Sequence, residues 1–94
     1  MTMMMINPAY AATILDLSAL LNSRGIPHRV RPMYDGLQIR FPWCDGDFIC
    51  HMYSHGCNNG DVESMGFEWD NDDVSRLSVE EAFSLVVKLY NTIK

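Results

Sequence analysis

Four possible zinc ligands, Cys50, His51, His55 and Cys57, fall within eight residues of one another. In an extended strand Cys50 and His51 would point to opposite faces, and His51 and His55 would lie about 13 Å apart at roughly 3.3 Å per residue. Zinc needs its ligands within about 2.3 Å of the ion. Only His55 and Cys57 could converge, so we expect no metal site beyond an incidental one at that pair, and no cofactor.

The same residues are poor candidates for covalent catalysis, which needs a thiol or hydroxyl within hydrogen-bond reach of a base. Cys50 is expected to face the core, where a thiol behaves as a small apolar group. No glycine-rich phosphate loop follows a strand and opens a helix. We therefore predict no catalytic residues and a protein that is not an enzyme.

Charge is divided unevenly along the chain. Residues 1–43 contain four arginines and two aspartates, whereas residues 45–81 contain ten acids and one base, Arg76. The net charge of −5 argues against broad binding to duplex nucleic acid, because such binding depends on neutralising phosphates. It leaves room for one local anion site near the arginines.

The length of 94 residues predicts a single domain, here residues 1–94, with residues 1–6 as a disordered N-terminal segment. No window approaches 18 consecutive apolar residues, and no basic residue precedes the Met-rich start, so we expect neither a membrane span nor a signal peptide. Three cysteines are too few for a disulfide scaffold. Free thiols and a cytoplasmic location are the expectation.

Helices are predicted at both ends. Asn7 and Pro8 read as an N-cap followed by proline at the first helical position, and Gly25 marks the end of this helix. Ser78 and Glu81 have the spacing of a capping box that opens a second helix.

Between the helices, three dipeptides favour tight turns: Asp35-Gly36, Asp45-Gly46 and Asn59-Gly60. They predict a four-stranded antiparallel meander, with pairs counted outward from each turn. One face then collects nearly all large apolar residues of the region, namely Val30, Leu37, Ile39, Phe41, Trp43, Phe48, Cys50, Met52, Met65, Phe67 and Trp69. The predicted fold is a two-layer α+β sandwich with both helices on that face.

The same registers leave the opposite face open to solvent, with Arg31, Arg40, His51 and Glu68 in one row across it. Two arginines side by side repel each other and favour an acidic ligand group. We predict a partner-binding site for another protein on this face, made of Arg29, Arg31, Arg40, His51, Tyr53 and Glu68. The predicted function is a non-enzymatic interaction or regulatory module; a merely polar, solvated surface is the alternative reading of these residues.

A second functional class is an acidic inhibitor that imitates nucleic acid and blocks a nucleic-acid-binding protein. Its surface would be formed by Asp70, Asp72, Asp73 and Glu80. The element order is similar to that of double-stranded RNA-binding domains, but the chain has an extra strand, and Glu80 and Glu81 stand where that family presents basic residues. Direct nucleic-acid binding is therefore not expected.

Self-association is a further expectation. Pro27 and Pro32 discourage pairing at the first strand, because proline has no amide donor. The strand predicted at 62–69 lacks proline and is expected to form the other edge, so a homodimer is predicted either through this edge or through the open sheet face.

Overall fold

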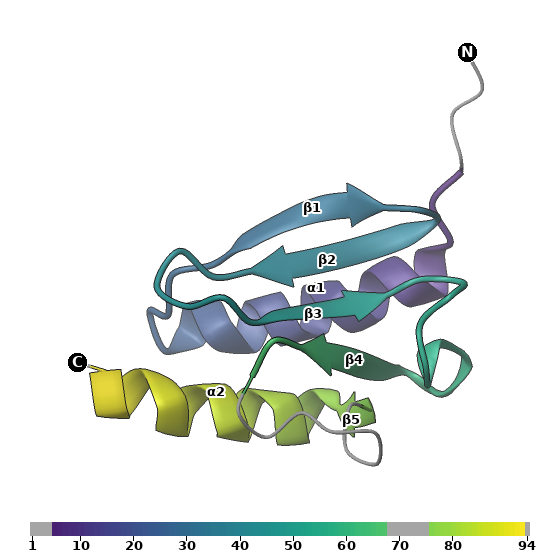
Figure 1. The fold of residues 1–94 in the computed structure, drawn as a ribbon. Helices are drawn as coiled ribbons and strands as arrows, with labels where there is room; N and C mark the ends of the chain where they lie inside the picture. The colour runs from purple at the N-terminus through teal and green to yellow at the C-terminus, as the bar shows by residue number, and fades with distance from the viewer. Residues whose placement is uncertain (1–4, 68–75, 94) are drawn as a thin grey trace.

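The computed structural model describes residues 5–67 and 76–93. Within them two helices pack on a five-stranded antiparallel sheet, which confirms the α+β sandwich (Figure 1). The elements in chain order are α1 (Pro8–Ser23), β1 (Arg29–Met33), β2 (Gly36–Arg40), β3 (Asp47–Cys50), η1 (Cys57–Asn59), β4 (Asp61–Met65), β5 (Arg76–Ser78) and α2 (Val79–Ile93). The sheet has one strand more than the four predicted, because β5 was not foreseen.

Helix α1 begins and ends where the sequence predicts. The Asn7 side chain accepts a hydrogen bond from the Ala9 amide at 2.9 Å. At the other end, the Gly25 amide donates to the Asn22 carbonyl and the Ile26 amide to the Leu21 carbonyl. This is the Schellman arrangement, and its left-handed position is occupied by Gly25 with φ of 64°.

Helix α2 starts on the predicted capping box. The Glu81 amide donates to the Ser78 hydroxyl oxygen, and the Ser78 amide donates to the Glu81 carboxylate, both at 3.1 Å. Ser78 is also the last residue of β5, so strand and helix follow each other without a loop. Neither α1 nor α2, the helices of the described residues, has the length and apolar character needed to cross a membrane.

The predicted register between the first two strands is wrong by two residues. Arg40 lies opposite Arg29, not Arg31, since the two-residue turn is formed by Tyr34 and Asp35. Gly36 belongs to β2, where a Cβ atom would lie 1.8 Å from the Cys50 carbonyl oxygen. This glycine is needed for a close approach of strands rather than for the turn. A shift of two residues leaves each side chain on its predicted face.

The next connection is longer than predicted. Residues 41–46 join β2 to β3, and Arg40 lies opposite Asp47 instead of His51. Gly46 is needed there because a Cβ atom would lie 2.2 Å from the Phe67 ring. The shift is again even, so the faces of β2 and β3 are as predicted.

Strand β4 is turned over relative to the prediction. The connection from β3 to β4 contains η1. In the resulting register, Phe48 lies opposite Ser64 and Asp47 lies opposite Met65. This is an odd shift, so Val62 and Ser64 face the helices, while Met65 is 48% exposed on the other side. The predicted position of Met65 on the apolar face is therefore wrong, and Ser64 is buried there in its place.

Strand β5 covers the start of the edge predicted for pairing. Val62 lies opposite Leu77 and Glu63 opposite Arg76, so β4 has neighbours on both sides. The predicted edge at 62–69 is therefore occupied by β5 at Val62 and Glu63. Residues 68 and 69 lie outside the described residues, and the homodimer stays a prediction.

The core lies between the helices and one face of the sheet. Ile14, Leu17 and Leu21 of α1 are fully buried against Ile39 and Phe48. Trp43 donates its indole N–H to the Pro27 carbonyl and lies against Phe41 and Tyr90. Of the predicted apolar face, Val30 and Met52 are exposed, and Trp69 lies outside the described residues.

The predicted disordered segment is described only in part. Residues 1–4 lie outside the described residues, while Met5 and Ile6 precede α1 and are exposed. The Asn7 amide donates to the Asp35 carbonyl, which ties the start of α1 to the β1–β2 turn.

Candidate functional site

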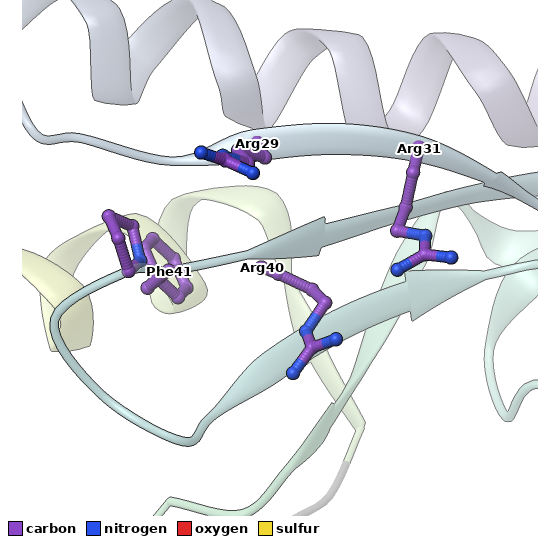
Figure 2. Close-up of a pocket in the computed structure, with 5 residues that line it drawn as sticks. Arg29, Arg31, Arg40 and Phe41 are labelled. Atoms are coloured by element: carbon purple, nitrogen blue, oxygen red, sulfur yellow. The ribbon is translucent and has the colours of Figure 1, made fainter.

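Three arginines lie on the sheet face that the helices leave open: Arg29 and Arg31 on β1 and Arg40 on β2. We call them the arginine strip. All three are exposed, and Figure 2 shows their side chains on the side of the sheet away from α1. Alternation along the two strands places them together, because residues 29 and 31 share a face and Arg40 lies directly opposite Arg29.

The arginine strip borders a pocket of about 340 Å³, whose wall is completed by Phe41 and Pro42. Phe41 is only 5% exposed and fixes this wall to the core. Guanidinium groups bind carboxylates and phosphates with two parallel hydrogen bonds, so the pocket combines anion-binding groups with an apolar boundary.

Within the described residues, no carboxylate pairs with the arginine strip. Like charges directly opposite each other destabilise a strand pair, and Arg29 and Arg40 are in this position. An anionic ligand would remove that repulsion. The electrostatics of the strip therefore favour an acidic group from outside the described fold.

The acids on the same face have other partners. Asp47, which is opposite Arg40, accepts a hydrogen bond from the Gln38 amide at 2.8 Å. Glu63 binds the backbone and ring of His55 at 2.8 and 2.7 Å. Asp61 pairs with the Arg76 guanidinium at 2.7 Å. The open face is thus divided into a basic half on β1 and β2 and an acidic half on β3 and β4.

His51 does not join the predicted row. It is 4% exposed and lies just beyond β3, and its Nδ1 accepts a hydrogen bond from the Tyr53 amide at 3.1 Å. Burial lowers the pKa of His51, and the nearby Asp35 and Glu63 oppose this effect. The row of Arg31, Arg40, His51 and Glu68 is therefore wrong for its described members, because neither Arg31 nor His51 lies opposite Arg40, and Glu68 lies outside the described residues.

Tyr34, His51 and Tyr53 form an aromatic corner at the β1–β2 turn. The Tyr34 ring lies 4.9 Å from His51 and 4.8 Å from Tyr53, both edge to face. Tyr53 was predicted as a site residue, and Tyr34 was missed. The turn is formed by Tyr34 and Asp35. Because Asp35-Gly36 is the more typical turn sequence, the turn was predicted one residue too late in the chain.

His55 and Cys57 do not converge on a metal position. His55 is exposed and bound to Glu63, whereas Cys57 is 7% exposed within the core. In the described part of the chain, no three His, Cys, Asp or Glu side chains are placed to hold a metal ion.

The cysteines are free thiols: Cys50 and Cys57 are buried and Cys44 is half-buried. Burial raises the pKa of the Cys50 thiol to about 11 and also raises the pKa of Cys44. A raised pKa reduces the thiolate fraction and with it nucleophilicity.

Of the four residues predicted to form the alternative acidic surface, the structure describes one, Glu80. Glu80 is exposed in the first turn of α2, where a carboxylate interacts favourably with the helix dipole. Asp70, Asp72 and Asp73 lie outside the described residues.

Comparison with known proteins gives no relative. No family model matches the sequence, and neither a curated protein nor a solved structure is significantly similar to it.

Proposed function

We propose that the protein is a non-enzymatic interaction module that binds an acidic segment of another protein through the arginine strip. The observation that carries this proposal is the set of Arg29, Arg31 and Arg40, exposed on the open sheet face beside an apolar pocket wall and without a carboxylate partner among the described residues. An acidic segment supplies the missing negative charge.

Two further features support this proposal. The described acids of the neighbouring strands are already hydrogen-bonded to other groups, so none of them neutralises the strip. The edge strand β1 contains Pro32, which removes an amide donor and disfavours addition of a partner strand. Side chains of the face, rather than backbone groups of the edge, would then recognise the partner. We place the protein in the cytoplasm, because its thiols suit a reducing compartment.

Charge reversal of Arg29 and Arg40 tests the proposal. Both side chains are exposed, so Arg29→Glu with Arg40→Glu should leave the fold intact and abolish capture of the partner from a lysate of the source cells. A matched control, Arg24→Glu with Lys88→Glu, makes the same change in net charge at exposed positions of the helical layer and should capture as wild type does. Captured proteins are identified by mass spectrometry.

Equal loss in both variants would show that overall charge controls capture, and unchanged capture by the sheet-face variant would remove the arginine strip from the site. The acidic-inhibitor alternative makes the opposite prediction. It expects capture of a nucleic-acid-binding protein to survive reversal of the arginines and to disappear when Asp70, Asp72, Asp73 and Glu80 are changed to their amides.

A further inference from the structure

The aromatic corner presents two large side chains to solvent on a fixed base. Tyr34 is 55% exposed and Tyr53 is 65% exposed, while His51 beneath them is buried. All three rings contact one another edge to face. Tyrosines held in this way offer apolar area at a low cost in conformational entropy, a property of residues that dominate binding at interfaces.

The backbone around the corner is held by hydrogen bonds. The Met52 amide donates to the Asp35 carboxylate at 2.8 Å, which links the segment after β3 to the β1–β2 turn. The Ser54 hydroxyl accepts from the His51 amide and donates to the His51 carbonyl. Because both tyrosines are attached to this bonded segment or to the turn, a ligand would meet them already ordered.

Tyr34 also adopts an uncommon conformation. Its φ of 53° makes it the one residue other than glycine in the left-handed region among the described residues. Such a conformation disfavours a large side chain, so a glycine or asparagine would suit the turn better. The contacts of the Tyr34 ring with His51 and Tyr53 offset part of this backbone cost.

The corner and the arginine strip lie on one continuous path. Arg29, Arg31 and Met33 share a face of β1, and Tyr34 follows directly. His51 belongs to the same corner because its ring lies 4.9 Å from that of Tyr34. At roughly 3.3 Å per residue, the end of β1 at Met33 lies about 7 Å beyond Arg31 and about 13 Å beyond Arg29, and the turn with Tyr34 begins there. An extended segment of about five residues would span the path.

We infer that the partner segment is linear and of mixed chemistry: a run of acidic residues over the arginine strip, ending in an apolar side chain against Tyr34 and Tyr53. This inference rests on the proposed function, and it adds to the acidic segment an apolar end that contacts the aromatic corner. The charge of the strip selects the acidic run, and the exposed rings, flanked by the 47% exposed Met52, select an apolar end.

Labelled peptides of equal length test the inference by fluorescence anisotropy. One contains only glutamate, one has leucine and tryptophan in place of the last two glutamates, and one has them in place of the first two. We expect wild-type protein to bind one mixed peptide roughly ten-fold more tightly than the all-glutamate peptide. The preferred mixed peptide gives the direction of the segment.

Variants separate the two halves of the site. Tyr34→Gly removes the ring and suits the positive φ, and Tyr53→Ala truncates an exposed side chain. Each should reduce binding of the mixed peptide to the all-glutamate level and leave all-glutamate binding unchanged. Leu15→Ala, at a 53% exposed position on α1, is the matched control and should bind as wild type does. Arg29→Glu with Arg40→Glu should lose all three peptides.

The outcomes distinguish the inference from the proposed function. If the three peptides bind wild type equally, or the tyrosine variants bind as wild type does, the inference is wrong, and arginine-dependent binding of the all-glutamate peptide would still support the proposed function. If no peptide binds, both fail. Displacement of the peptide by inorganic phosphate at constant ionic strength would indicate a site for small anions. Sedimentation of the protein as an arginine-dependent dimer would indicate that a second copy of the chain occupies the site. Either result would refute the inference of a linear partner segment.

Discussion

Truncation of Phe48 tests the packing that positions the site. Phe48 is fully buried in β3, opposite Ile39 and Ser64, and its ring contacts Phe41 and Phe67. Replacement by alanine removes these contacts and leaves a cavity, so we expect Phe48→Ala to lower the free energy of unfolding by about 3–5 kcal/mol. For a domain of this size that corresponds to a fall in Tm of roughly 15 °C or more.

Met65→Ala is the informative comparison, because the register of β3 with β4 places Met65 on the open face and 48% exposed. A surface truncation of this kind should change the free energy of unfolding by less than about 0.5 kcal/mol. If Met65 faced the core, its truncation would cost about 2–5 kcal/mol.

Urea unfolding followed by circular dichroism measures both variants, with the m-value as a check on two-state behaviour. A loss below about 1 kcal/mol for Phe48→Ala, or a loss above about 2 kcal/mol for Met65→Ala, would refute the register argued above. Phe41→Ala and Phe67→Ala, at buried positions beside Phe48, should behave as Phe48→Ala does.

Two further predictions concern titratable groups. Burial lowers the pKa of His51 in the folded state, so the unfolded chain takes up its proton first as the pH falls below about 6.5, and stability is lost until the folded pKa is passed. Urea titrations at several pH values should show this added acid sensitivity in wild type and not in His51→Gln; equal slopes would contradict it. Alkylation by iodoacetamide at mildly alkaline pH, followed by mass spectrometry, should modify half-buried Cys44 before Cys50, whose pKa of about 11 keeps it a thiol; faster reaction of Cys50 would contradict its burial.

The parts of the fold that local chemistry determines were predictable. Asn7, Gly25 and the pair of Ser78 and Glu81 act within one helical turn of their own positions, so they locate both ends of α1 and the start of α2 directly. Apolar residues recur three and four positions apart in both helices, which predicts that both cover the sheet; they are Ile14, Leu17 and Leu21 in α1 and Ala82, Val86 and Leu89 in α2.

Registers were less predictable because they depend on contacts distant in sequence. Gly36 and Gly46 read as turn glycines, but they lie where the Cys50 backbone and the Phe67 ring approach too closely for a side chain. Even shifts at the first two connections preserved the faces. The odd shift introduced by η1 did not, and it exchanged Ser64 with Met65.

The charged part of the candidate site was predictable, whereas the arrangement of the aromatic corner was not. Arg29, Arg31 and Arg40 share a face under both the predicted and the observed register, because their shift is even. His51 was placed in a charged row, whereas the segment after β3 bends and buries it under Tyr34. No local pattern indicates that bend, which depends on the Asp35 carboxylate binding the Met52 amide.

The direct passage from β5 into α2 has a consequence for cooperativity. Ser78 pairs with Asp61 in the sheet and caps α2, so one residue belongs to both layers. A slip of β5 along β4 would displace the helix start and break the capping box, and separation of α2 from the core would release the strand. Sheet pairing and helix docking at this end should therefore be lost in a single step, and amide hydrogens of β5 and of the first turn of α2 should exchange with the same opening free energy.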